Sequence, residues 1–244
     1  MTAPLRAFGL TRRFGTETAV DDIDLQVKAG DIHAVVGLNG AGKTTLMRLF
    51  LGMLRPDAGR AQILGVDAGE ATSAVWTRVG HLIETPFAYP ELTVRENLRA
   101  SALLHSVPSR EIDRVVDRVV DQFELGHWID RRAGVLSLGN RQRLGLASAL
   151  VHEPSVLILD EPANSLDPAG VVFIRDLLRQ YAADGAAVFV SSHHLDQLAR
   201  IAGTITVMHR GRQVGALDPG GIDLEQSFFD LVHQSDLMLR ESRK

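Results

Sequence analysis

The chain of 244 residues contains no cysteine, which excludes disulfides, thiolate zinc sites, iron–sulfur clusters and a cysteine nucleophile. It also lacks an excess of basic charge, because 26 Lys and Arg residues stand against 30 Asp and Glu residues and the net charge is −4. The composition therefore does not favour a nucleic-acid partner. The longest apolar runs fall well short of the roughly 20 residues that a membrane span requires. The N-terminus has no apolar core of a secretory signal, so we expect a cytoplasmic chain that reaches a membrane only through a partner.

Alternating strand and helix patterns are what the sequence does contain. Its 45% hydrophobic and 23% charged residues are typical of a globular protein, and the length fits one large domain or two modest ones. Apolar runs predict strands at residues 32–36, 156–159 and 186–191, the last of these being the final strand, and helices at 43–54 and 171–181. This alternation predicts a parallel sheet that helices cover on both faces.

The middle third of the chain has a helical pattern instead. Between residues 110 and 123 the apolar side chains recur at intervals of three and four, and they are Ile112, Val115, Val116, Val119, Val120 and Phe123. We therefore interpret residues 86–135 as a mostly helical insertion. A shorter amphipathic helix is predicted at residues 224–232.

The first chemical motif is Gly37-Leu-Asn-Gly-Ala-Gly42-Lys43-Thr44, the phosphate-loop pattern of glycine, any four residues, Gly-Lys and Ser or Thr. Its glycines let backbone N–H groups converge on an anion at a helix N-terminus. Lys43 is predicted to reach the β- and γ-phosphates, and the Thr44 hydroxyl to bind Mg²⁺. The alternative is a glycine-rich turn without function, but a strand before the motif and a helix after it favour nucleotide binding.

The second motif is Val156-Leu-Ile-Leu-Asp160-Glu161, an apolar strand that ends in two carboxylates. Asp160 is expected at the carboxyl end of a parallel strand, where ligands of open α/β sheets collect and where a magnesium ligand is needed. Glu161 can orient or deprotonate an attacking water. By itself, an apolar run followed by Asp-Glu is equally typical of a turn at a strand end. Together with the phosphate loop, it indicates a magnesium and nucleotide site.

The third motif, Leu136-Ser137-Leu138-Gly139-Asn140-Arg141-Gln142-Arg143, opens a helix predicted to reach residue 150. Ser191-Ser192-His193 follows the strand at 186–191. In this order and at these spacings, the motifs resemble the ATP-binding subunits of ABC transporters over nearly the whole chain. A small-molecule P-loop kinase would have no use for residues 137–143 ahead of the Asp-Glu strand.

The resemblance implies an α/β fold: a P-loop NTPase (RecA-like) core with a parallel sheet, an N-terminal antiparallel β subdomain and an α-helical subdomain. It implies one ABC ATPase domain over residues 1–244. Residues 1–85 and 153–244 would form the nucleotide-binding core with the β subdomain, and residues 86–152 the helical subdomain that ends in the signature helix.

The resemblance also assigns roles to residues, with ATP and Mg²⁺ as cofactors. The catalytic residues would be Lys43, Glu161 and His193. The metal ligands would be Thr44, Glu84 and Asp160. Nucleotide contacts within one chain would come from Phe14, Gly37, Asn39, Gly40, Ala41, Gly42, Lys43, Thr44 and Thr45. Ser137, Gly139 and Asn140 would act on the nucleotide of a second subunit, and residues 164–167 would cross the dimer interface. Without the resemblance, Phe14 would be an ordinary core residue.

Two departures from the family pattern point to one branch. In the signature, Leu138 stands where the family has its first glycine and Asn140 where it has a glutamine, and Glu84 stands where the family commonly has another glutamine. Together with Pro-Phe-Ala-Tyr-Pro-Glu-Leu-Thr-Val-Arg-Glu-Asn at 86–97 and Ser191-Ser-His-His-Leu195, they resemble the ATPases of bacitracin- and lantibiotic-type exporters. The implied partners are a separate transmembrane permease subunit and a second ATPase subunit, identical or not, at the inner face of the cell membrane.

Further alternatives stay open at this point. A soluble ABC ATPase of assembly or repair would share every nucleotide motif. A nucleotide-gated module could hydrolyse ATP poorly because of Leu138 and Glu84. Pro86, Phe87 and Tyr89 are predicted to form an exposed contact for the membrane subunit, the alternative being a proline-rich loop packed on its own domain.

Overall fold

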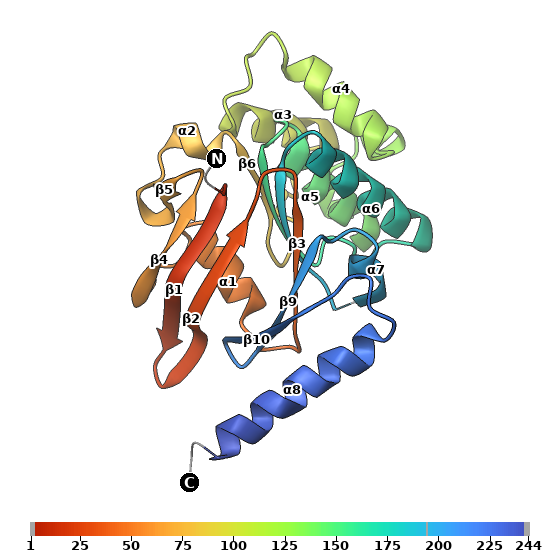
Figure 1. Cartoon of the computed structure of the whole chain (residues 1–244). Coiled ribbons are helices and arrows are strands. Elements are labelled where there is room, and N and C mark those ends of the chain that lie inside the picture. The colour runs from red at the N-terminus through yellow and green to blue at the C-terminus, as the bar shows by residue number, and fades with distance from the viewer. Residues whose placement is uncertain (1–2, 194, 242–244) are drawn as a thin grey trace.

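The computed structural model describes residues 3–193 and 195–241, and its strands form two sheets (Figure 1). An antiparallel sheet of order β2-β1-β4-β5 consists of β1 (Leu5–Phe14), β2 (Glu17–Val27), β4 (Ala58–Ile63) and β5 (Val66–Asp67). A second sheet has the order β10-β9-β3-β8-β7-β6, with β3 (Ile32–Val36), β6 (Val79–Leu82), β7 (Val156–Asp160), β8 (Ala187–Ser191), β9 (Thr204–His209) and β10 (Arg212–Leu217). Its strands are parallel except β10, which runs antiparallel to β9.

Helices surround the second sheet. They are α1 (Lys43–Phe50), α2 (Ser73–Trp76), α3 (Val94–Leu104), α4 (Ile112–Gln122), α5 (Leu138–Leu150), α6 (Pro168–Ala183), α7 (Leu195–Ala199) and α8 (Leu224–Glu241), with 3₁₀ turns η1 (Ala68–Glu70), η2 (Gly126–Trp128) and η3 (Ala133–Val135). Local chemistry explains where several begin. Thr93 and Glu96 form a reciprocal capping box at α3, and Asp167 caps α6 ahead of Pro168.

Two hydrophobic cores lie on opposite faces of the six-stranded sheet. The alternation along β3 divides its side chains between them: Ala34 and Val36 pack with the helical part of the chain, and Val35 packs with α1 and the antiparallel sheet. In the second core the rings of Phe50 and Phe189 meet edge to face at 5.5 Å. The predicted α/β fold, with a parallel sheet covered on both faces and an antiparallel β part near the N-terminus, is confirmed.

Several element predictions are confirmed and some are wrong. The strand at 32–36 and the helix within 110–123 are present, but the helix predicted at 43–54 ends at Phe50 because Gly52 turns the chain with a φ of +64°. The strand at 186–191 is not the last, since β9 and β10 follow it. Helix α8 runs to Glu241, well past the predicted end at 232.

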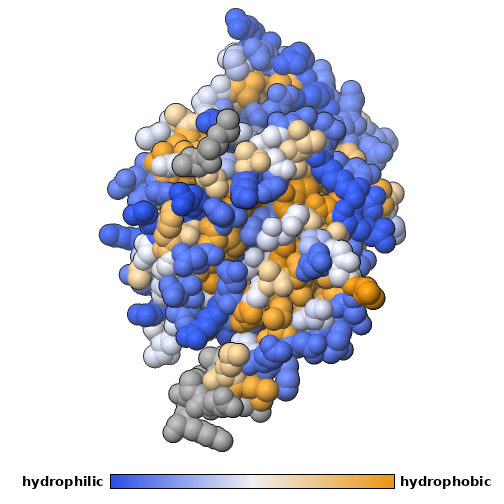
Figure 2. Space-filling model, viewed as in Figure 1, coloured by the Kyte–Doolittle hydropathy of each residue, from blue (hydrophilic) through white to orange (hydrophobic). Residues whose placement is uncertain are grey.

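The face of the molecule in Figure 2 carries hydrophobic patches that are interrupted by hydrophilic side chains. Among the described residues, no helix combines the length and the apolar character needed to traverse a bilayer.

Candidate functional site

The site is built on the loop between β3 and α1. A Cβ on Gly37 would stand 2.3 Å from the carbonyl oxygen of Met208, so only glycine fits there. Gly42 has a φ of +102°, and a Cβ on it would stand 2.1 Å from the Ala19 carbonyl oxygen. Gly42 also precedes α1 without a side-chain cap, so the first N–H groups of the helix have no side-chain acceptor from it. The loop is therefore a cradle of backbone donors at a helix N-terminus, suited to an anion.

Lys43 folds back over this loop. Its Nζ donates a hydrogen bond to the Gly37 carbonyl oxygen at 2.7 Å. Burial lowers the pKa of Lys43, while the nearby carboxylates of Glu161 and Asp160 oppose that shift. The lysine thus supplies a partly desolvated positive charge at the loop.

Asp160 ends β7 beside the loop, as the sequence predicts. The Thr44 hydroxyl donates to Asp160 Oδ2 at 2.6 Å, and the Ser191 hydroxyl donates to Asp160 Oδ1 at 2.5 Å. Ser191, at the end of β8, also accepts a hydrogen bond from the Glu161 N–H at 2.9 Å. The phosphate loop and the ends of β7 and β8 are therefore joined through one buried carboxylate.

Glu161 lies immediately after Asp160 and adopts a φ of +49°, a left-handed conformation that costs free energy for a residue with a side chain. Its Oε2 lies 2.9 Å from Nδ1 of His193 and accepts a hydrogen bond from the His193 backbone N–H at 3.3 Å. The predicted base and the predicted switch histidine are thus in direct contact. His194, which the branch motif includes, lies outside the described residues.

A cleft of about 390 Å³ opens over the loop. Its predicted lining residues are Phe14, Asn39, Gly40, Ala41, Gly42, Lys43, Thr44, Thr45, Asp160 and Glu161, and Glu17 and Ala19 of β2 complete it. Sequence reasoning missed Glu17 and Ala19, because no motif marks the start of β2. The Phe14 side chain is 45% exposed, and the Arg12 guanidinium lies 4.7 Å from its ring centroid. Phe14 lines the cleft, whereas Arg12 does not.

The signature residues do not join this cleft. Ser137 caps α5, where its hydroxyl accepts the Asn140 N–H at 3.3 Å, and neither residue nor Gly139 is among those that line the cleft. The backbone at Gly139 instead approaches Ser165, since a Cβ there would be 2.9 Å from the Ser165 carbonyl oxygen. Within one chain, the cleft therefore lacks the signature residues, which the family resemblance assigns to the nucleotide of a second subunit.

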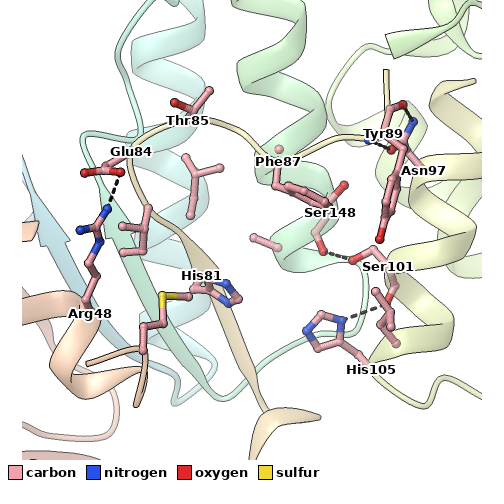
Figure 3. A pocket seen from close by; sticks show the side chains of 16 residues that line it. Arg48, His81, Glu84, Thr85, Phe87, Tyr89, Asn97, Ser101, His105 and Ser148 are labelled. Carbon is pink, nitrogen blue, oxygen red and sulfur yellow. Dashed lines mark hydrogen bonds and ion pairs between the residues drawn. The ribbon is translucent and has the colours of Figure 1, made fainter. Parts of the chain in front are cut away.

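Glu84 lies in a different hollow. Its carboxylate accepts a hydrogen bond from Arg48 at 2.6 Å, at one end of a cavity of about 450 Å³ that Phe87, Tyr89 and His105 also line (Figure 3). Among the described contacts, the Glu84 carboxylate pairs with Arg48 and not with Thr44 or Asp160. Its role as a metal ligand stays a prediction.

A glycine-rich loop between strand and helix, a lysine over it, and the contact between Thr44 of α1 and Asp160 at the end of β7 define a P-loop nucleotide-binding protein with an open α/β sheet. Residues 20–164 match the ABC transporter family. The chain is 36% identical over 213 residues to the bacitracin transport ATP-binding protein BcrA of Bacillus licheniformis, covering 87% of this chain and 69% of that protein. It is 37% identical over 206 residues to the daunorubicin resistance ATP-binding protein DrrA3 of Streptomyces coeruleorubidus, covering 84% and 65%.

The fold is similar to the solved structure of an ATP-binding subunit of an ABC transporter, with a TM-score of 0.87, 25% identity and coverage of 94% of this chain and 99% of that one. This chain therefore belongs to the ABC transporter family and is one of its ATP-binding ATPase subunits. It spans about two thirds of the length of the two sequence relatives, 69% of BcrA and 65% of DrrA3.

Proposed function

We propose that this ATPase subunit pairs with a second ATPase subunit and uses ATP to drive export through a separate membrane subunit. The relatives act in bacitracin transport and daunorubicin resistance, and we assign this chain a cargo of that kind, a drug, peptide or lipid. The observation that carries the proposal is the incomplete site: the phosphate loop, Asp160 and Glu161 share one cleft, whereas Ser137 and Gly139 lie elsewhere.

The chemistry follows from the residues of the cleft. Backbone N–H groups of the loop and Lys43 bind the phosphates, and Phe14 stacks on the adenine. Glu161 takes the proton of the attacking water, and His193 holds its carboxylate in position and reaches towards the γ-phosphate.

Thr44 and Asp160 fit Mg²⁺, because their oxygens already lie 2.6 Å apart and Mg²⁺ takes one or two protein oxygens beside phosphate oxygens. When bound, Mg²⁺ neutralises phosphate charge. Glu84 could contribute only after leaving Arg48.

A second copy would complete the site. Ser137 and the first N–H groups of α5 form a positive helix N-terminus with an exposed hydroxyl. Turned towards the cleft of a neighbour, this end would bind the γ-phosphate, with Asn140 beside it. The head-to-tail pair would then enclose two ATP molecules, and residues 164–167 would lie at the interface.

We assign the contact with the transmembrane subunit to the surface around the cavity of Figure 3. Phe87 is 71% exposed and meets Tyr89 edge to face at 5.0 Å, whereas Pro86 packs on α5, where a Cβ on Gly145 would be 2.6 Å from Pro86 Cβ. The two rings are thus available to a transmembrane subunit, which would hold the chain at the inner face of the cell membrane. The mutual contacts of α3, α4 and α5 support residues 86–152 as a helical subdomain against a core of 1–85 and 153–244.

The test of the paired site mixes two inactive variants. Lys43→Ala removes the phosphate-binding lysine but leaves the signature, and Ser137→Asp leaves the loop but sets a carboxylate against the γ-phosphate. Asp is a good helix cap, so the second variant keeps α5. Each variant alone is expected to hydrolyse little ATP, and the mixture to regain activity, because half of the sites in each mixed pair are intact. A mixture as inactive as its components would contradict the shared site.

A further inference from the structure

The turn between β9 and β10 stands directly behind the nucleotide cleft. Arg210 and Gly211 make it with φ values of +48° and +82°. On the cleft side, the Gly211 N–H donates to the Ala41 carbonyl oxygen at 3.0 Å, and the Gly211 carbonyl oxygen accepts the Asp21 N–H at 2.8 Å. The turn therefore bonds both to the phosphate loop and to β2.

These two attachments belong to two walls of the cleft, which meet where Gly42 packs on the Ala19 carbonyl oxygen. Ala41 lines it from the phosphate loop, and Ala19 lines it from β2 on the side of Phe14. Gly211 packs closely on the second wall, because a Cβ on it would be 3.1 Å from the Ala19 carbonyl oxygen. A displacement of the turn would thus change the spacing between the wall that binds phosphate and the wall that carries Phe14.

On its far side the turn is held by a single carboxylate of α8. Asp236 Oδ1 lies 3.0 Å from Nε2 of His209 and 3.0 Å from a guanidinium nitrogen of Arg210. The His209 side chain is buried, whereas the side chain of Arg210 is 57% exposed and that of Asp236 is 32% exposed, so only the contact with His209 is sheltered from solvent. Asp236 therefore contacts both of the residues that precede Gly211, His209 and Arg210.

Helix α8, which carries Asp236, packs on the sheet close to this contact. Phe228 and Val232 are buried in the same core as β9 and β10. Leu231 packs on β10 where Gly215 leaves room, since a Cβ at Gly215 would be 2.8 Å from Leu231 Cδ2. The helix is thus fixed to the sheet one turn before Asp236.

We propose that Asp236 is a positioning residue for ATP: by holding the turn at 209–211, it sets the spacing of the two walls of the nucleotide cleft from a helix that lies outside it. The inference rests on ATP binding in this cleft. It gives Asp236 of α8 a role in nucleotide binding, although none of the described residues of this helix lines the cleft.

The test uses the whole chain with Asp236→Ala and Asp236→Asn. Trinitrophenyl-ATP binding is measured by fluorescence titration, and KM and kcat for ATP by phosphate release. Asp236→Ala is expected to raise Kd and KM together by about three- to tenfold, since the contact with the buried His209 and the ion pair with Arg210 are lost together, with kcat within about twofold. Asp236→Asn is expected to have a smaller effect, because its amide oxygen still accepts one hydrogen bond.

Asp230→Ala and Asp230→Asn are the matched controls, because Asp230 lies on α8 and pairs only with Gln226 of the same helix among the described contacts. They should leave Kd, KM and kcat unchanged. Arg210→Ala combined with Asp236→Ala should raise Kd less than the sum of the two single effects, because both remove one contact.

Unchanged Kd and KM in both Asp236 variants would overturn the inference, as would a lowered melting temperature without a change of Kd or an equal effect in the Asp230 variants. If Asp236→Ala does not fold, Asp236→Asn decides in the same way. An unaltered chain that fails to bind the analogue, with Lys43→Ala as reference for no binding, would instead refute the nucleotide site itself.

Discussion

Two groups of His193 contact the same carboxylate oxygen of Glu161. Nδ1 of the His193 ring lies 2.9 Å from Glu161 Oε2, and the His193 backbone N–H donates a hydrogen bond to that atom at 3.3 Å. This contact joins the end of β8 to the end of β7 and holds a carboxylate whose backbone has a φ of +49°. A residue with a side chain keeps a left-handed backbone conformation only where the surrounding contacts hold it there. The carboxylate that we propose as the catalytic base is therefore held in one orientation by His193.

Replacing Glu161 by glutamine should stop hydrolysis and leave ATP binding intact. The amide keeps the size of the side chain and a contact with His193, but it cannot take a proton. We expect phosphate release to fall at least about 100-fold, as the loss of a general base usually causes. Glu17→Gln is the control, because Glu17 lines the same cleft. Hydrolysis by Glu161→Gln at the parental rate would remove Glu161 from its role.

Adding one methyl group at Gly42 should destroy nucleotide binding. The Cβ would lie 2.1 Å from the Ala19 carbonyl oxygen, in a backbone with a φ of +102°. Gly69→Ala is the matched change, since a Cβ there meets nothing within 4 Å. Calorimetric titration with ATP should detect binding in the second variant and none in the first. Similar affinities would mean that the loop tolerates what the geometry forbids.

Phe14→Ala should weaken ATP binding without affecting catalysis of the bound nucleotide. Stacking of a base on an aromatic ring is worth about 1–3 kcal/mol, so Kd should rise by roughly five- to 150-fold. Phe14 lines the cleft and is 45% exposed, and the Arg12 guanidinium lies over its ring. Phe229→Ala, an exposed ring on α8, is the control. An unchanged Kd for ATP would contradict stacking of Phe14 on the adenine.

Acid should destabilise the fold through His33, which is buried and hydrogen-bonded to Thr206 at 2.9 Å. Burial lowers the pKa of His33 from 6.5 to about 4. The unfolded chain therefore binds a proton between these values that the folded chain refuses, so stability falls as the pH drops below 6.5 and levels off below about 4. At pH 5 the loss amounts to about 2 kcal/mol.

Urea unfolding at pH 7.5 and pH 5 measures this loss. His33→Gln keeps a hydrogen-bonding side chain and should reduce the difference between the two pH values by about 2 kcal/mol. Burial also lowers the pKa of His152, to about 3, so part of the acid sensitivity remains. The exposed His127→Gln should change nothing. An equal loss in the His33 variant and the parent would place the sensitivity elsewhere.

The sequence was sufficient where short spacing determines structure. The glycines at 37–42 and Lys43 predict the loop between β3 and α1, and the interval of the apolar residues predicts α4. It was insufficient where distant segments meet. The sequence around Glu84 does not predict that its carboxylate forms an ion pair with Arg48. The sequence of the phosphate loop likewise does not predict that the Met208 backbone of β9 fills the space beside Gly37. These contacts come from tertiary packing, which local patterns do not record.

The most direct measurement is affinity capture of tagged Glu161→Gln protein from detergent-solubilised native membranes with ATP, followed by mass spectrometry. The account predicts one multi-span membrane protein in the capture, retained through Phe87 and Tyr89. The same capture with Phe87→Ser added should lose that protein while ATP binding persists. Recovery from the soluble fraction only, with soluble partners or none, would contradict a transport subunit and favour an ABC ATPase that works away from the membrane.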